Sequence, residues 1–226
     1  MAADGVWVVI PAWNEQPVIA DVVQAVRASF PNVVVVDDCS RDATREAALA
    51  GGAVVLRHPI NLGQGAALQT GIRYALSRGA GFIVTFDADG QHRVEDIGVL
   101  LATQQRTGAD VVIGSRFLGA AENLPALRRA ILKLAVMFTR LTSGLKVTDA
   151  HNGLRLLTRS AAQRIEIRQN RMAHASEIID QIRRLGLSVA EAPVTIVYTE
   201  YSLRKGQRLG NALNILVELL VAKVNK

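Results

Sequence analysis

Cysteine is almost absent from this sequence of 226 residues, and Cys39 is the only one. A lone cysteine excludes an internal disulfide framework and fits a reducing compartment such as the cytoplasm. No stretch reaches the roughly 20 apolar residues that a membrane-spanning helix needs. The first residues also lack the basic segment and the long apolar segment of a signal peptide. We therefore expect a cytoplasmic protein without a membrane span of its own.

Aromatic residues are scarce as well, at 4% of the chain, although the formal net charge is +6. A scarcity of aromatic side chains argues against a stacking platform for single-stranded nucleic acid. The positive charge then fits an anionic membrane surface or phosphorylated substrates better than a nucleic-acid partner. The strand-end carboxylates described below also oppose nucleic acid, because they repel phosphate unless a cation is bound.

Two nucleotide-binding fingerprints are missing. The sequence contains no G-x-x-x-x-G-K-[ST] motif, which excludes a P-loop protein. The loop at residues 61–65 has Leu68 where a dinucleotide fingerprint has its third glycine, and it follows the third predicted strand instead of the first. Both features disfavour a nicotinamide-dependent oxidoreductase. The two glycines of this loop still let the backbone approach an anion at the start of the next helix.

What the chain does contain is a regular alternation of short apolar runs and helical patterns between residues 6 and 115. We predict strands at residues 6–10, 33–36, 53–56, 82–86 and 111–113. The helices that we predict between them cover residues 16–29, 41–50, 65–78 and 94–107. Strands that alternate with helices form βαβ units, so we expect an α/β fold with a mostly parallel, Rossmann-like sheet and helices on both faces.

The predicted strand at residues 82–86 ends in two carboxylates, Asp87 and Asp89, separated by Ala88. Ligands of an open α/β sheet bind beyond the carboxyl ends of its strands. Carboxylates this close repel each other unless a cation lies between them, and Mg²⁺ or Mn²⁺ prefers such oxygen ligands. The amide oxygen of Gln91 offers a further ligand. A surface turn rich in aspartate and glycine is the alternative interpretation of the same residues.

Polar residues also follow two other predicted strands. Residues 11–15 read Pro-Ala-Trp-Asn-Glu, and residues 37–40 read Asp-Asp-Cys-Ser. Three such strand ends on one edge of a sheet are typical of a nucleotide and metal site. Each has a simpler explanation by itself, because Ser40 or Asp42 would cap the next helix and Pro11 would shape a turn.

Six segments occur in the order in which one enzyme family has them. They are IPAWNE at 10–15, VVDDCSRD at 35–42, NLGQG at 61–65, DADGQH at 87–92, GSRF at 114–117 and DAHNGLR at 149–155. On these segments the chain resembles the inverting glycosyltransferases of family 2, which have the GT-A fold. Within that family it is most similar to the branch of dolichyl-phosphate mannose synthases and polyprenyl-phosphate glycosyltransferases.

The resemblance implies a role for each matched residue. The pocket for the base and ribose of a nucleotide-sugar donor would be lined by Pro11, Trp13, Glu15 and Asp38. The donor diphosphate and a Mg²⁺ or Mn²⁺ ion would be held by Asp87, Ala88, Asp89 and Gln91, with Asp87, Asp89 and Gln91 as metal ligands. Arg116 would contact the phosphate of the lipid acceptor. Positive charge at the donor would be added by Arg204, Lys205 and Arg208.

The acceptor implied by the resemblance is a polyprenyl phosphate, dolichyl or undecaprenyl, which is already anionic and needs no general base. A family 2 transferase acting on a sugar hydroxyl of a glycan or glycolipid is the alternative, and it needs one. Glu177 lies where the family often has an acidic residue near the acceptor, which makes it the candidate catalytic base. Its structural alternative is a place in the first turn of a helix, where it complements the dipole. For His92 and His151, which border the site loops, we favour a structural hydrogen bond over catalysis.

The sequence departs from the family pattern at two places. Members often have tyrosine at the position of Trp13, and the charges of the late basic segment at residues 201–208 are shifted. The basic residues precede the predicted helix at 211–226, so they lie on a connection. We therefore expect them on a mobile loop that closes over phosphates as a lid and faces no anion while the site is empty.

Two apolar segments bear on membrane contact. Residues 126–142 form an amphipathic helical pattern, which would pack on the sheet or lie in a membrane interface, and the resemblance favours the interface. Residues 211–226 form a largely apolar helix that is too short to span a bilayer. That helix would pack on the domain, on a second copy, on a small membrane protein or on lipid. We expect a catalytic domain over residues 1–210, peripheral on the cytoplasmic face of the membrane.

Overall fold

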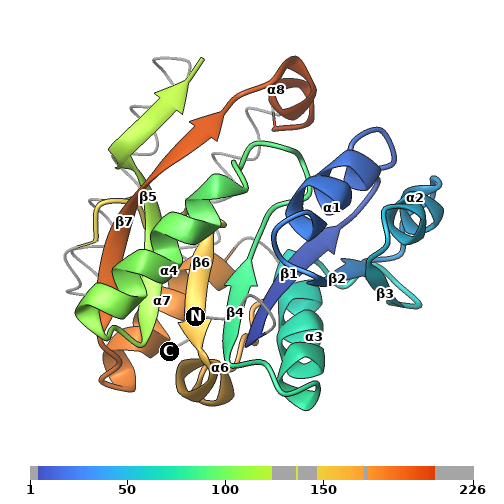
Figure 1. Cartoon of the computed structure of the whole chain (residues 1–226). Coiled ribbons are helices and arrows are strands. Elements are labelled where there is room, and N and C mark those ends of the chain that lie inside the picture. Colours follow the sequence, from blue (N-terminus) through green and yellow to red (C-terminus); the bar gives the residue numbers. More distant parts are fainter. Residues whose placement is uncertain (1–4, 124–135, 137–146, 171–172, 207–226) are drawn as a thin grey trace.

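The computed structural model describes residues 5–123, 136, 147–170 and 173–206. These residues form a mixed sheet in the strand order β3-β2-β1-β4-β6-β5-β7, with helices packed on it (Figure 1). The strands are β1 (Val6–Ala12), β2 (Asn32–Asp37), β3 (Val54–Arg57), β4 (Phe82–Thr85), β5 (Val111–Glu122), β6 (Arg155–Thr158) and β7 (Val189–Val197). The helices are α1 (Ile19–Arg27), α2 (Thr44–Ala50), α3 (Gln64–Ser77), α4 (Glu95–Thr107), α6 (Arg159–Arg164), α7 (His174–Arg184) and α8 (Glu200–Gly206).

The sheet is mostly parallel, as predicted. The central strand β1 pairs in parallel with β2 on one side and with β4 on the other, and β2 pairs in parallel with β3. Strand β6 runs antiparallel to both β4 and β5, and β7 runs parallel to β5. The α/β fold is therefore confirmed, with two strands, β6 and β7, that the sequence analysis did not locate.

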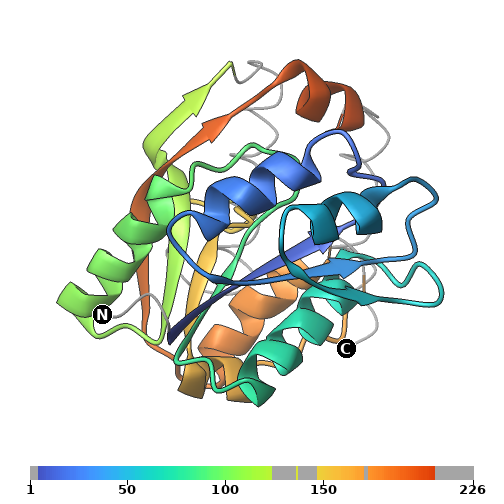
Figure 2. The same cartoon turned by 45° about the vertical axis from the view of Figure 1, so that its right-hand side comes forward.

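Helices cover both faces of the sheet, because successive residues of a strand point to opposite faces and both sets here are apolar. On one face, Val8 and Ile10 of β1 pack in a core with α1, α2 and α4. On the other face, Val9 packs with α3, α6 and α7. The two views show α4 and α7 on opposite sides of the sheet (Figure 1, Figure 2). Burial of both faces explains why β1 and β2 read as continuous apolar runs.

Strand β1 is longer than predicted and includes Pro11, which lies opposite Val36 of β2. Its pairing with β4 ends at Val9 and Thr85, so the missing N–H of Pro11 interrupts no ladder on that side. The interpretation of Pro11 as a turn residue is therefore wrong. The residue belongs to the strand that delivers the next loop to the carboxyl edge of the sheet.

Strand β5 continues to Glu122 instead of ending at Ile113. It follows β7 through a register shift between Ser115 and Ala120. Gly119 permits this approach, since a Cβ there would lie 2.3 Å from the backbone oxygen of Val194. The sequence pattern hides the extension because the residues beyond Ser115 leave the buried layer, so their apolar and polar positions no longer mark one face.

Several expected features lie outside the described residues. They are the predicted C-terminal helix at 211–226, Arg208 and, apart from Val136, the predicted interface helix at 126–142. The end of the predicted catalytic domain at residue 210 lies there too. Within the ranges that are described, no helix has the length and the apolar character to cross a membrane.

Candidate active site

The loops that follow β1 and β2 are joined to each other at the carboxyl edge of the sheet. Asn14 N donates to Ser40 Oγ at 2.9 Å, and Arg41 N donates back to Asn14 Oδ1 at 2.9 Å. Glu15 N donates to Thr44 Oγ1 at 2.7 Å, at the start of α2. Helices α1 and α2 begin later than predicted, at Ile19 and Thr44. The contacts between the two loops make them one platform.

Glu15 is the point where this platform meets helix α8. Its carboxylate accepts a hydrogen bond from Tyr201 Oη at 2.8 Å and pairs with Lys205 Nζ at 2.5 Å. Lys205 also donates to the backbone oxygens of Trp13 and Asn14, at 2.9 and 2.8 Å. Trp13 itself is 49% exposed, so its aromatic face is accessible for stacking. The structure thus brings the predicted donor residues Trp13, Glu15 and Lys205 together.

The basic segment differs from the mobile loop that we expected. Arg204 and Lys205 belong to the short helix α8, and Lys205 already faces the carboxylate of Glu15. The expectation that these charges face no anion in the empty site is therefore wrong for Lys205. Burial and the hydrogen bond to Glu15 raise the pKa of Tyr201, so its hydroxyl stays a donor to that carboxylate at neutral pH. The side chain of Arg204 is outside the described part of the chain.

Asp38, at the end of β2, uses its carboxylate inside the protein. Its Oδ1 accepts a hydrogen bond from Leu62 N at 2.9 Å, and its Oδ2 accepts one from Gly63 N at 2.6 Å. His58 Nδ1 lies 2.7 Å from Asp38 Oδ1, and His58 Nε2 lies 2.9 Å from Thr70 Oγ1. Asp38 therefore anchors the glycine loop that leads into α3. Its contact with a donor base stays a prediction.

Asp87 follows β4 and is bonded at both carboxylate oxygens. Gln64 Nε2 donates to Oδ1 at 3.2 Å, and His92 Nε2 donates to Oδ2 at 2.9 Å. Burial opposes its ionisation, but the hydrogen bond from His92 and the charges of His174 and Arg155 hold the pKa of Asp87 below its ordinary value. Asp87 is thus an anion at neutral pH. The structural hydrogen bond that we favoured for His92 is confirmed.

Asp89 behaves in the opposite way. Burial and the neighbouring charge of Asp87 raise the pKa of Asp89 to about 6, and the charge of Glu15 acts in the same direction. Its Oδ1 accepts a hydrogen bond from Gln91 N at 3.1 Å. Ala88, between the two carboxylates, is buried in the core, so the loop is fixed from below.

The two carboxylates fit the ion that the sequence predicts. A divalent cation between Asp87 and Asp89 would relieve the repulsion that opposes the ionisation of Asp89. Among the described residues, no group of three or more His, Cys, Asp and Glu side chains is arranged to hold a metal by itself. Mg²⁺ and Mn²⁺ suit such a sparse set of oxygen ligands, because they complete their shells with water and substrate phosphate.

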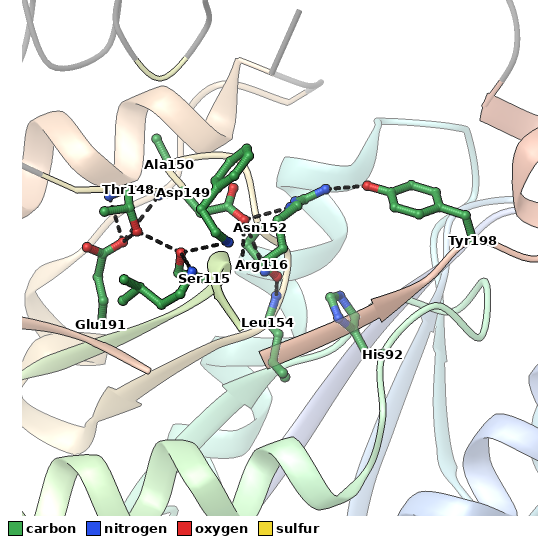
Figure 3. A network of polar contacts seen from close by, with 12 residues as sticks. His92, Ser115, Arg116, Thr148, Asp149, Ala150, Asn152, Leu154, Glu191 and Tyr198 are labelled. Carbon is green, nitrogen blue, oxygen red and sulfur yellow. Dashed lines mark hydrogen bonds and ion pairs between the residues drawn. The ribbon is translucent and has the colours of Figure 1, made fainter. Parts of the chain in front are cut away.

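The side chain of Arg116 is only 8% exposed and lies in a polar network (Figure 3). Its Nε donates to Asp149 Oδ2 at 2.6 Å, and its Nη1 donates to Tyr198 Oη at 2.6 Å. Glu191 Oε1 accepts a hydrogen bond from Thr148 N at 2.7 Å and so fixes the loop that carries Asp149. Although burial opposes a charged guanidinium, Asp149 and Tyr198 raise the pKa of Arg116. Arg116 is thus held in one orientation, and its contact with an acceptor phosphate stays a prediction.

A second buried arginine, Arg155 of β6, lies behind the site. Its Nη2 donates to Ala150 O at 3.0 Å. Burial lowers the pKa of Arg155 to about 10, against the attraction of Asp87 and Asp149, so it remains charged at neutral pH. Burial and the charge of Arg155 also lower the pKa of His151 to about 4, so His151 is neutral. Arg155 therefore supplies a fixed positive charge that attracts both Asp87 and Asp149.

Glu177 lies in the first turn of α7. This is the position expected from the alternative interpretation, in which Glu177 complements the helix dipole. Its two carboxylate oxygens accept hydrogen bonds from the backbone N–H groups of Arg168 and Gln169, at 2.8 to 3.2 Å. The loop held in this way reaches α3, because Gly65 N donates to Asn170 O at 2.8 Å. Glu177 thus supports a loop beside the site, and its role as a base stays a prediction.

The structure adds partners that the sequence analysis did not mark as site residues. Gln64 and Gly153 contact the carboxylate of Asp87, and Tyr201 contacts that of Glu15. Gln64 and Gly153 belong to the matched segments NLGQG and DAHNGLR. Membership of these segments was the one feature of the sequence that could have marked them as site residues. Tyr201 lies far along the chain from Glu15, and no local pattern links the two.

Comparison with known proteins identifies the family of this chain. The family described as Glycosyl transferase family 2 matches residues 7–166. The uncharacterized protein MJ1222 of Methanocaldococcus jannaschii is 37% identical over 98% of this chain and 93% of its own length. The UDP-N-acetylglucosamine–dolichyl-phosphate N-acetylglucosaminyltransferase of Methanococcus voltae is 31% identical, over 100% of this chain and 99% of its own. The polyprenol monophosphomannose synthase of Mycolicibacterium smegmatis is 33% identical, over 88% and 79%.

A solved structure shares the fold. The glucosyl-3-phosphoglycerate synthase of Mycobacterium tuberculosis, in complex with Mn²⁺, UDP-glucose and phosphoglyceric acid, superposes with a TM-score of 0.74 at 19% identity. The match covers 96% of this chain and 78% of that one. With the GT-A-like sheet, the strand-end carboxylates and the matched sequence in agreement, the chain belongs to glycosyltransferase family 2.

Proposed function

We propose that this enzyme transfers a sugar, with inversion, from a nucleoside-diphosphate sugar to a polyprenyl phosphate with the help of Mg²⁺ or Mn²⁺. The observation that carries the proposal is the pair Asp87 and Asp89 beside the platform of Glu15. Burial and the charge of Asp87 raise the pKa of Asp89 to about 6, and a divalent cation between the two carboxylates would offset this repulsion. Two relatives named for transfer to dolichyl phosphate or polyprenol support this acceptor class.

The donor would lie across the platform. The exposed side chain of Trp13 would stack on the base. Glu15, whose carboxylate also binds Tyr201 and Lys205, would contact the ribose hydroxyls. Asp87 and Asp89, with the amide oxygen of Gln91, would hold the ion. When bound, that ion neutralises the diphosphate and the charge that grows on it as it leaves.

The proposed reaction needs no general base from the protein. The bond between the anomeric carbon and the donor diphosphate breaks while a phosphate oxygen of the acceptor bonds to the opposite face of that carbon. A phosphate acceptor carries no proton that must be removed, in contrast to a sugar hydroxyl. The protein's tasks are then to orient the two substrates and to stabilise the leaving diphosphate, for which Lys205 would supply positive charge.

The surroundings of Glu177 support the phosphate acceptor over a sugar hydroxyl. A general base needs an oxygen within hydrogen-bond reach of the acceptor proton. Both oxygens of Glu177 already accept backbone hydrogen bonds from Arg168 and Gln169. In a hydroxyl-directed enzyme, Glu177 would have to serve this loop and the acceptor proton at the same time.

A lipid acceptor requires a way to meet the membrane. We propose that the amphipathic pattern at residues 126–142 and the apolar pattern at 211–226 serve this purpose on the cytoplasmic face. The contact would be made with lipid, with a small membrane protein, or through a second copy of the chain. The net charge of +6 favours an anionic surface.

The test is a panel of UDP- and GDP-sugars with Mg²⁺ or Mn²⁺ and a polyprenyl phosphate, monitored for a glycosylated lipid. We expect one donor to give a metal-dependent product whose anomeric configuration is opposite to that of the donor. Glu46→Gln, on the exposed surface of α2, is the control and should react as the wild type does. Transfer to a glycan hydroxyl, with none to the lipid phosphate, would favour the alternative acceptor.

A further inference from the structure

The carboxylate of Asp87 is surrounded by His92, Gln64 and Gly153. A loop that only carried a metal ligand would not need all three neighbours. We propose that His92 and Gly153 are positioning residues that together fix the orientation of Asp87 toward the divalent cation. The inference rests on the proposed function, because it concerns the ion that Asp87 would hold. It assigns to the two residues a task that is separate from contact with substrate.

His92 fixes one edge of the carboxylate. Its Nε2 lies 2.9 Å from Asp87 Oδ2, and its side chain is only 3% exposed. The ring packs edge-on against Phe86, with 5.3 Å between ring centroids. The backbone of His92 forms a bridge with Ile196, and Gln91 O accepts a hydrogen bond from Val197 N at 2.9 Å. The imidazole is therefore held from both its ring and its backbone, so it can hold Asp87 in turn.

Gly153 fixes the face of the same carboxylate. A Cβ at this position would lie 2.2 Å from Asp87 Oδ2 and 2.5 Å from both Cγ and Oδ1, so only glycine leaves room. The φ angle of Gly153 is not positive, so the need for glycine is one of space. Thr85 Oγ1 donates to Gly153 O at 2.6 Å and keeps this peptide in place.

The result is a carboxylate that is held in one orientation and keeps lone pairs free for a metal. Gln64 donates to Oδ1 from the remaining edge, at 3.2 Å. An ionised carboxylate has about four lone-pair sites, and these two donors use one on each oxygen. The others are presented in a fixed orientation, which is what partners behind a metal ligand usually provide.

The other nitrogen of His92 makes the test decisive. His92 Nδ1 is buried and has no hydrogen-bond partner among the described residues. Only the Nε2 donor is then needed for positioning. Glutamine carries an N–H at the same number of bonds from Cα as histidine Nε2, whereas leucine fills similar space without a donor. If His92 were only a packing residue beside Phe86, leucine would replace it better than glutamine would.

The experiment measures Mn²⁺ binding directly, by the electron paramagnetic resonance of free Mn²⁺, alone and with UDP or GDP. We expect His92→Leu to bind Mn²⁺ about 10–100-fold more weakly than the wild type, and His92→Gln to lie within about threefold of it. Circular dichroism and thermal unfolding establish that each variant is folded. Equal binding by His92→Leu, or weaker binding by His92→Gln than by His92→Leu, would overturn the role of His92.

Gly153→Ala tests the same inference from the other side. Its Cβ must displace Asp87, so we expect a similar loss of Mn²⁺ affinity. Gly98→Ala in α4 is the matched control, because a Cβ there meets nothing within 4 Å. Unchanged Mn²⁺ binding by Gly153→Ala would contradict the proposal. A wild type that binds no Mn²⁺ with either nucleotide would remove the metal from the proposed function, and the inference with it.

Discussion

Lys205 Nζ lies 2.5 Å from Glu15 Oε1, and this contact joins helix α8 to the loop that follows β1. The same carboxylate accepts the hydroxyl of Tyr201 at 2.8 Å. Helix α8 is thus attached to the platform by the carboxylate of Glu15 and by the backbone oxygens of Trp13 and Asn14, before any substrate is present. An incoming diphosphate would compete with Glu15 for Lys205.

The attachment of α8 predicts the effect of Glu15→Gln. The ion pair is partly exposed, so its loss should cost about 1 kcal/mol. If opening of α8 precedes cleavage, trypsin should then cut at Arg204 or Lys205 about fivefold faster, as read from the first fragments by mass spectrometry. Glu46→Gln, which removes the exposed partner of Arg45, should digest at the wild-type rate. An unchanged rate for Glu15→Gln would show that the pair does not hold the helix.

The raised pKa of Asp89 predicts that this residue destabilises the metal-free protein. Its pKa is about 6 in the folded chain, against about 3.9 when unfolded. The folded state therefore binds a proton more tightly, and stability from Asp89 is lost as the pH rises from about 4 to about 6. In buffer with EDTA at pH 7.5, Asp89→Asn should be more stable than the wild type by about 2–3 kcal/mol.

Urea unfolding at several pH values measures this difference in the free energy of unfolding. The gap between Asp89→Asn and the wild type should close as the pH falls to about 4. Mg²⁺ with the donor nucleotide should then raise the melting temperature of the wild type only, since ligands that bind the folded state stabilise it. The same variant should lose nearly all transfer activity while staying folded. Metal-dependent turnover near the wild-type level would remove Asp89 from the metal site.

The sequence was sufficient for the parallel half of the fold and insufficient for the rest, for physical reasons. Strands β1, β2 and β4 are buried on both faces, so their apolar runs and the polar residues after them are visible locally. Strand β6 is short and antiparallel, and it is defined only by its pairing with β4 and β5. Nothing in its own residues distinguishes it from a loop.

The site shows the same division. The carboxylates Asp87 and Asp89 could be predicted because they end a strand. The contacts of Glu15 with Tyr201 and of Asp87 with Gly153 could not, because each joins residues far apart in the chain. Lys205 was expected to be free for the same reason, since the anion that it meets comes from the other end of the sequence.

The Arg116–Asp149 pair predicts a large loss of stability on truncation. Both side chains are buried, at 8% and 1% exposed, so Asp149→Ala leaves a buried guanidinium without its counter-ion. We expect the free energy of unfolding to fall by about 3–5 kcal/mol. Tyr198→Phe removes only one hydrogen bond to that group and should cost about 1.5–3 kcal/mol. Glu122→Gln, which breaks the exposed pair with Arg93, should cost less than about 1 kcal/mol in the same urea titrations.

Glu177→Gln separates the two acceptor classes. With a polyprenyl phosphate we expect turnover to fall by less than about tenfold, because no proton is removed and only the support of residues 168–169 is weakened. The Michaelis constants for both substrates should change little. A thousandfold loss of turnover with unchanged substrate binding would instead identify Glu177 as the base of a hydroxyl-directed transferase.

The basic residues of α8 and beyond predict a coupled loss of binding and turnover. Replacing Arg204, Lys205 and Arg208 by alanine removes three positive charges, and Lys205 lies on the platform proposed for the donor. The leaving diphosphate gains negative charge in the transition state. Turnover should therefore fall together with diphosphate affinity, even on a soluble short-chain polyprenyl phosphate in detergent-free buffer. If the three charges only attracted anionic lipid, vesicle binding would fall while turnover on the soluble acceptor stayed normal.

Arg78→Ala, at the far end of α3, is the control for a simple loss of surface charge. Normal turnover of the triple variant on the soluble acceptor would contradict a catalytic role for this segment.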